Sequence, residues 1–324
     1  MRRRGGDDGG LELGTSAVAV LVVALVAAIG LELLHGSRLS IAKFGWSFWT
    51  GRDWDPVSGE FGALPFIWGT FYSSLLALLV AAPVGVGIAV FTTDVVPPRF
   101  RRPLAFLSEL LAAVPSIVYG LWGIFVLVPI VRGLETFVSR TPLRKLPLFS
   151  GPPYGLGMLS AGLILALMVI PYVTSVSREV LQAVPVAQRE AAYALGATRW
   201  EAIRAALHYG RTGILGAVFL GFGRAFGETM AVTMVIGNNP QLSASLFAPQ
   251  YSMAAVIANE FSEATGDLYL HALTEIGLVL FVVTLLVNAG SRLLIWTVQR
   301  GPGRVSDAVP APEAMPPARA GEAA

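Results

Sequence analysis

The sequence predicts an all-α integral membrane protein with six transmembrane helices. Of its 324 residues, 54% are hydrophobic and only 14% are charged, whereas soluble domains carry about 25% charged residues. The apolar residues gather in six runs of roughly 20 residues, the length that an α-helix needs to cross a bilayer. The formal net charge of +2 is too small to favour a nucleic-acid partner. We therefore expect membrane lipid, and no nucleic acid, around this chain.

The first apolar run is preceded by charged, glycine-rich residues. Residues 1–16 cannot bury enough surface to fold, so we expect a disordered cytoplasmic tail there. The run that follows is longer than the apolar part of a signal peptide, and further spans follow it, which favours an uncleaved helix. The predicted spans are residues 17–34, 66–91, 104–131, 156–176, 212–236 and 272–298.

Proline and glycine divide several of these runs. Pro83 predicts a bend in the second span, and Pro115 predicts a break in the third, where neighbouring helices would satisfy the freed carbonyl groups. A short surface helix is expected at residues 253–263. Residues 301–324 are rich in Pro, Ala and Gly, which is typical of a disordered tail. The membrane domain is thus predicted over residues 17–300.

The distribution of positive charge predicts the orientation. With an even number of spans, both termini lie on one side. Most of the 23 Lys and Arg residues fall on the side of the termini, which positive charge marks as the cytoplasm. We expect a multi-pass protein of the cell inner membrane with both termini cytoplasmic.

Motifs of catalysis and metal binding are missing from the sequence. There is no cysteine, and the three histidines lie far apart, so no metal-ligand spacing is present. Neither the phosphate-binding loop of ATPases nor the HExxH and GxSxG motifs occur. We expect no cofactor, no metal and no enzymatic activity, and any ATP hydrolysis must come from another subunit.

The most polar internal segment, residues 178–211, predicts a helix-turn-helix between two spans. Residues 187–195 and 199–207 fit short helices, and Gly196 lies where the chain must turn. Thr198 followed by Glu201 three residues later is a capping box. The small side chains of the first helix allow close docking of a partner. A solvated helix pair without a partner remains the alternative on pattern alone.

The fifth span contains charge at its centre. Arg224 lies midway along residues 212–236, where an arginine costs at least about 2.5–3.5 kcal/mol. Glu228 follows at i+4, on the same face of a continuous helix, and Thr229 adds a hydroxyl. Two interpretations stay open at this point. Either an internal ion pair fixes packing, or the planar guanidinium meets a passing anion and Glu228 holds Arg224 while the path is empty.

Two motifs resemble a known family. The run EAAYALG at 190–196 is similar to the coupling loop of ABC importer permeases, which docks on the ATPase subunit. The resemblance implies that Glu190, Ala191, Ala192 and Gly196 form the ATPase contact. The family usually has a Leu-Pro pair after this loop, whereas this chain has LHYG at 207–210.

Longer runs resemble the PstC family of phosphate permease subunits. They are GRAFGETMAVTMVIGN at 223–238, LLAAVPSIVYGLWGIFVLVP at 110–129 and SASLFAPQYSMAAVIANEF at 243–261. The resemblance implies the MetI-like fold of type I ABC importers, ATP-driven phosphate import, and a substrate path with Arg224, Glu228 and Thr229. It also implies a PstA-like sister permease, two PstB-like ATPase subunits and a PstS-like phosphate-binding protein.

Two other functions compete with this expectation. A permease for another oxyanion, such as molybdate or sulfate, would share the fold and the coupling loop. A stand-alone ion-coupled carrier would need no ATPase, and the coupling loop argues against it.

Overall fold

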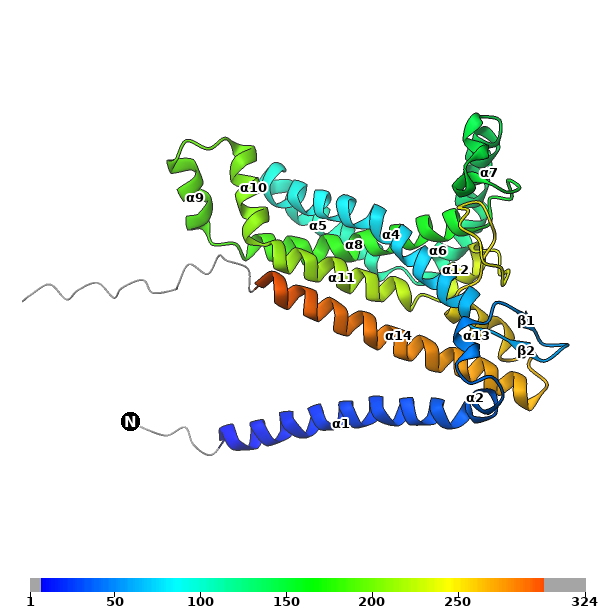
Figure 1. Ribbon diagram of the computed structural model, residues 1–324. Coiled ribbons are helices and arrows are strands. Elements are labelled where there is room, and N and C mark those ends of the chain that lie inside the picture. The colour runs from blue at the N-terminus through cyan, green and yellow to red at the C-terminus, as the bar shows by residue number, and fades with distance from the viewer. Residues whose placement is uncertain (1–6, 300–324) are drawn as a thin grey trace, which may run out of the picture.

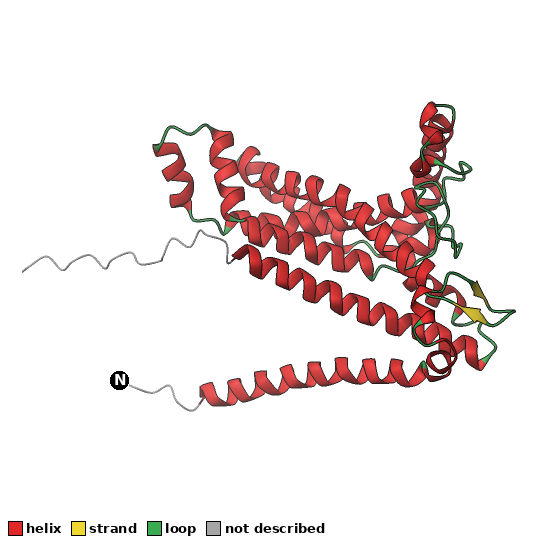
Figure 2. Ribbon diagram, viewed as in Figure 1, coloured by secondary structure: helices red, strands yellow, loops and turns green. Residues whose placement is uncertain are grey.

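The computed structural model describes residues 7–299, which are helical apart from loops and one two-stranded hairpin. Figures 1 and 2 show long helices side by side, with short helices at both ends of the bundle. The first half of the described chain contains α1 (Asp7–Gly36), α2 (Arg38–Phe44), α3 (Ser47–Thr50), β1 (Trp54–Asp55), β2 (Glu60–Phe61), α4 (Leu64–Val90), η1 (Phe91–Val95), α5 (Pro98–Ala113), α6 (Ser116–Trp122), η2 (Gly123–Leu127), α7 (Val128–Ser139), η3 (Pro142–Lys145) and η4 (Pro147–Phe149). The second half contains α8 (Met158–Gln182), α9 (Val186–Ala194), α10 (Arg199–Tyr209), α11 (Arg211–Phe226), α12 (Met230–Val235), α13 (Met253–Glu260) and α14 (Asp267–Gln299).

Five stretches of the described chain are long and apolar enough to cross a membrane. They are Glu12–Gly36, Leu64–Val95, Ser116–Ser139, Met158–Gln182 and Asp267–Thr297. The interrupted helix formed by α11 and α12 supplies the remaining span. The all-helical membrane fold with six spans is therefore confirmed, although two of the spans differ from the prediction.

The third span is broken at Pro115 as predicted, because α5 ends at Ala113 and α6 begins at Ser116. The predicted bounds 104–131 are wrong, since they join parts of two separate helices. Val114 is extended, with ψ 129, as expected for a residue before proline. The apolar helix starts after Pro115 and continues through the π-helical turn η2 into α7, which is turned away from the direction of the long helices (Figure 1).

The fifth span is not one continuous helix. The helix α11 ends at Phe226, residues 227–229 are non-helical, and α12 resumes at Met230. Non-helical backbone at membrane depth occurs where protein or water surrounds it. The break lies beside the charged residues of this span, so the periodicity that predicted a shared helix face for them does not apply.

The core of the bundle forms where α4 packs along α8. Glycines permit the close approach: a Cβ on Gly85 would lie 3.0 Å from the Val173 side chain, and one on Gly162 would lie 2.4 Å from Leu76. The helix α11 joins them through Gly221, where an added Cβ would lie 2.9 Å from both Val169 and Val173. Small residues at helix interfaces are typical of membrane bundles, since packing rather than water exclusion drives association there.

The loop side of the bundle is also well packed. The Trp54 indole donates to Glu260 Oε2 at 2.9 Å, and the Tyr269 hydroxyl donates to the same oxygen at 2.6 Å. The predicted surface helix exists as α13, but Met253 through Val256 are buried. It is therefore a structural helix that packs the loop at residues 237–266 against the bundle, rather than a surface helix.

The start of α1 and the end of α14 lie at the same end of the bundle as α9 and α10 (Figure 1). This arrangement agrees with an even number of spans. Helix α1 begins at Asp7 rather than after residue 16, so the predicted disordered tail is helical from that point on. Residues 1–6 and the predicted tail at 301–324 lie outside the described residues.

Candidate functional site

Arg224 lies in the last turn of α11, directly before the break. The carbonyl end of a helix favours a positive charge. The side chain is exposed in this single chain, and its guanidinium carbon lies 6.0 Å from the centre of the Tyr172 ring on α8. The glycines beside it leave space, because a Cβ at Gly227 would approach no atom closer than 4.0 Å. The arginine is therefore held near aromatic and backbone groups with its donors open.

Glu228 and Thr229 occupy the break itself. Glu228 Oε1 accepts a long hydrogen bond of 3.4 Å from the backbone N–H of Ala231. The hydroxyl of Thr229 donates to the Gly227 carbonyl at 3.5 Å, and the Thr229 carbonyl accepts from Thr233 at 2.7 Å. These contacts complete the ends of α11 and α12. They leave both side chains half-buried at the interruption.

The predicted ion pair between Arg224 and Glu228 does not form. Within residues 7–299 the ion pairs are Arg178 with Glu109 and Arg189 with Asp94. The helix ends between Arg224 and Glu228. Arg224 therefore projects from a helical turn and Glu228 from non-helical backbone, so the two side chains do not share a helix face. Among the described residues the structure therefore shows neither a packing ion pair nor Glu228 holding Arg224 in an empty path.

The second predicted site is the helix-turn-helix formed by α9 and α10, which we call the coupling elbow (residues 186–209). Gly196 has φ +83, and its N–H bonds to the Tyr193 carbonyl while the N–H of Ala197 bonds to that of Ala192. These two bonds form a Schellman motif, which requires a left-handed residue that glycine supplies at little cost. The predicted turn at Gly196 is confirmed.

The capping box at the start of α10 is confirmed as well. The Thr198 hydroxyl accepts from the Glu201 N–H, and Glu201 Oε2 accepts from the Thr198 N–H at 2.7 Å. These hydrogen bonds hold the pKa of Glu201 below its usual value. The turn between the two helices is therefore fixed from both sides.

The elbow presents its outer surface to solvent. Glu190 and Ala191 are exposed and Ala192 is half-buried. Leu195 is 89% exposed and Trp200 is 65% exposed, which is unusual for large apolar side chains without a partner. Ile203 and Leu207 of the same helix as Trp200 turn inward, onto Ala89, Val90 and Leu181.

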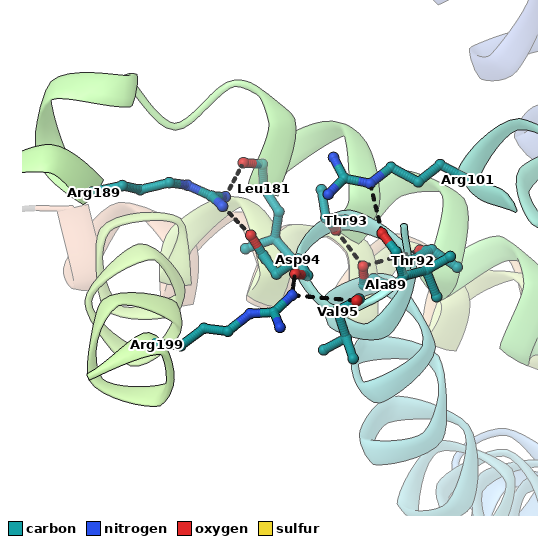
Figure 3. Close-up of polar contacts among 10 residues, drawn as sticks. Ala89, Thr92, Thr93, Asp94, Val95, Arg101, Leu181, Arg189 and Arg199 are labelled. Carbon is teal, nitrogen blue, oxygen red and sulfur yellow. Dashed lines mark hydrogen bonds and ion pairs between the residues drawn. The ribbon is translucent and has the colours of Figure 1, made fainter. Parts of the chain in front are cut away.

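The sequence did not reveal how the elbow is attached. Arg189 of α9 and Arg199 of α10 both contact Asp94, in the π-helical turn that ends α4 (Figure 3). No spacing in the sequence connects these residues, which are far apart in the chain. The sequence offered one indication of this contact: Asp94 is an acidic residue at the end of an apolar span.

Comparison with known proteins identifies the family. A family model described as binding-protein-dependent transport system inner membrane component matches residues 81–296. The chain belongs to this family. It is therefore a membrane transport component that works with a separate binding protein, and it is not itself an enzyme.

Curated relatives match nearly the whole chain. It is 45% identical to the phosphate transport system permease protein PstC of Mesorhizobium japonicum, over 89% of this chain and 90% of that protein. Against PstC of Haemophilus influenzae it is 47% identical, over 90% and 93%. The probable PstC of the archaeon Methanocaldococcus jannaschii is 37% identical, over 84% and 88%.

Solved structures of the MetNI methionine ABC transporter in inward-facing conformations share the fold. One chain superposes with a TM-score of 0.52 at 16% identity, covering 74% of this chain and 95% of that chain. At this identity the likeness concerns the fold alone. The MetI-like importer fold expected from the coupling loop is confirmed.

Proposed function

We propose that this chain is the permease subunit of an ATP-driven phosphate importer and forms one half of the path for inorganic phosphate. The identity of about 45% to PstC proteins over nearly the full chain carries the proposal. Both termini are cytoplasmic in this proposal. The partners are a PstA-like sister permease, two PstB-like ATPases and a PstS-like binding protein.

In this proposal Arg224 is the contact for the passing anion. An arginine at membrane depth must face protein, water or an anion, because lipid solvates it poorly. Its exposed guanidinium has no carboxylate partner among the described residues. The planar donor fork suits two phosphate oxygens at once. The break at residues 227–229 adds Glu228 and Thr229 beside it.

In this proposal the energy of ATP reaches the chain at a second region, the coupling elbow. Glu190, Ala191, Ala192 and Gly196 form the ATPase contact in this proposal, supported by the exposure of the elbow and by Leu195 and Trp200 on it. When the ATPases close on ATP, they would move the elbow and rock the attached spans. Alternating exposure of the Arg224 region to the two sides of the membrane would follow.

Uptake by the purified four-component complex in proteoliposomes tests the proposal. Labelled phosphate should accumulate only with ATP inside and loaded binding protein outside, and dissipating ion gradients should not stop it. Stimulation of ATP hydrolysis by sulfate- or molybdate-loaded binding protein, with none from phosphate, would instead assign another oxyanion. Uptake that persists without the ATPase would assign an ion-coupled carrier.

A further inference from the structure

Asp94 lies at a junction of three segments that are distant in the sequence. It sits in η1, the π-helical turn that ends α4, and its side chain is only 6% exposed. Arg189 of α9 forms an ion pair with Asp94 Oδ1 and donates to the Leu181 carbonyl at 3.1 Å. Arg199 of α10 donates to the carbonyl of Asp94 and, at 3.2 Å, to that of Val95. Figure 3 shows both arginines reaching the Asp94 turn from the same side of the view, Arg189 above Arg199. We call Asp94, Arg189 and Arg199 the Asp94 junction.

The end of α4 explains why arginines gather there. The last carbonyls of a helix have no partner within the helix and carry its negative partial charge. The π-helical turn closes with a bond from the Val96 N–H to the Phe91 carbonyl, which leaves the carbonyls that follow free. Arg199 takes two of them, and Arg101 of α5 donates to the carbonyl of Val96 at 3.0 Å. Two arginines from two helices thus cap this helix end, and Arg189 pairs with the Asp94 side chain beside them.

Burial makes the junction hard to separate. Asp94 Oδ2 is buried and has no hydrogen-bond partner, so the carboxylate depends on Arg189 for compensation of its charge. Removing one partner of a buried pair leaves an uncompensated charge and is strongly unfavourable. In the other ion pair among the described residues only the carboxylate is exposed, because Glu109 is 58% exposed whereas Arg178 is 15% exposed. Water therefore compensates the charge of Glu109 in part, so this carboxylate depends less on its arginine than Asp94 does.

The junction is also connected to the substrate region. Helix α4 leads directly into η1. Near the end of α4, the Gly85 carbonyl accepts a hydrogen bond of 3.2 Å from the Thr174 hydroxyl of α8. Gly85 lies against Val173 of α8. The preceding residue on α8 is Tyr172, whose ring faces Arg224. A displacement of α4 therefore reaches the Arg224 region through direct packing.

We propose that Asp94 is a positioning residue whose carboxylate locks α9 to the end of α4, beside the backbone contacts that attach α10 there, so that force on the elbow moves α4 and α8 as one body. This inference rests on the proposed function, in which an ATPase docks on the elbow. A single docked helix could slide or pivot against the bundle. Arg189 of α9 holds the Asp94 carboxylate, and Arg199 of α10 holds the backbone carbonyls of Asp94 and Val95, so both helices of the elbow are attached to one turn and lose that freedom.

The test is Asp94→Asn in the complete transporter reconstituted in proteoliposomes. Asparagine keeps the shape and removes the charge that holds Arg189. We expect the complex to assemble and hydrolyse ATP, while phosphate moved per ATP falls about tenfold, within the range of mutations that weaken coupling between sites. Wild-type transport per ATP in this variant would overturn the inference. Loss of ATP hydrolysis and transport in equal proportion would do the same, because that pattern indicates a structural role.

A matched control separates the junction from the effect of losing an ion pair. Glu109→Gln makes the same chemical change in the pair with Arg178, where the carboxylate is exposed, and we expect transport per ATP close to that of the wild type. Equal losses in both variants would contradict a special role for Asp94. The wild-type complex is the reference for the proposed function: without phosphate uptake by the wild type that function fails, whereas normal coupling by Asp94→Asn removes only the junction.

A cross-link decides the matter if Asp94→Asn does not assemble. The chain has no cysteine, so the double variant Asp94→Cys and Arg189→Cys carries the only thiols of this subunit. A bis-maleimide that bridges them replaces the ion pair by a covalent bond. We expect bridging to raise transport per ATP toward the wild-type value, since the two segments move together. Inactivation on bridging would overturn the inference by showing that the junction must open.

Discussion

Arginines serve opposite purposes in two regions of this molecule. At the Asp94 junction, Arg189 and Arg199 are fully engaged with a carboxylate and with carbonyl oxygens at the end of α4. At the break between α11 and α12, Arg224 makes no ion pair with any described residue and faces an aromatic ring. Paired donors make a rigid connection, whereas open donors are free for a ligand. The difference separates the region that transmits force from the region proposed to meet phosphate.

The largest effect is expected from Arg224→Ala. Losing two charge-assisted hydrogen bonds to phosphate should reduce uptake by at least about 100-fold. Arg224→Lys keeps the charge but loses the planar fork, so it should also transport poorly. Co-purification of the subunits checks that the complex still assembles. Uptake at the wild-type rate in the alanine variant would mean that Arg224 is not on the path.

Gly196→Ala should give the next largest effect. The residue has φ +83, and a Cβ there would meet no atom within 4 Å, so the cost is one of backbone conformation, about 1–2 kcal/mol. We expect the turn of the elbow to shift and ATPase binding to weaken several-fold. Gly266→Ala is the control, because Gly266 also has open space but no left-handed φ. Equal binding by both variants would argue against a coupling role for this turn.

Glu228→Gln should have a moderate effect that sharpens the contrast between the regions. Glu228 has no arginine partner in this structure among the described residues, so neutralising it leaves no buried positive charge uncompensated. If the Glu228 carboxylate helps to release the anion from Arg224, the glutamine variant should bind phosphate more tightly and release it more slowly. Its turnover should then fall several-fold, which corresponds to a barrier higher by about 1 kcal/mol. Phosphate titration of uptake rates separates the two quantities. Unchanged affinity and turnover would exclude Glu228 from the path.

The smallest effect concerns pH at the elbow. The pKa of Glu201 is lowered by hydrogen bonds from Thr198. Its contribution to the stability of α10 is therefore present above the ordinary pKa, about 4.5, and is lost as the pH falls through the lowered value. Hydrogen exchange of residues 199–209 should show more protection in the wild type than in Glu201→Ala at neutral pH. The difference should vanish once the pH falls below the lowered pKa of Glu201, and a difference that does not change with pH would contradict the capping role.

The elements that local chemistry controls were predictable from the sequence. Apolar runs of sufficient length located the spans, because every backbone group in lipid must be bonded within a helix. The turn at Gly196 and the capping box at Thr198 depend on bonds between near neighbours, so their short motifs were enough. Arg224 was also visible in the sequence, because a charged residue in the middle of an apolar run can be read from the run alone.

Only the tertiary structure decided what these residues contact. The fifth span reads as one helix in the sequence, yet it stops at Phe226, and this separates Arg224 from Glu228. The third span shifts across Pro115, and α13 is buried because α4 and α14 cover it. The Asp94 junction joins residues about a hundred positions apart, and no local rule records such a meeting. Sequence periodicity describes one helix at a time, whereas partners across the bundle depend on how all the helices pack.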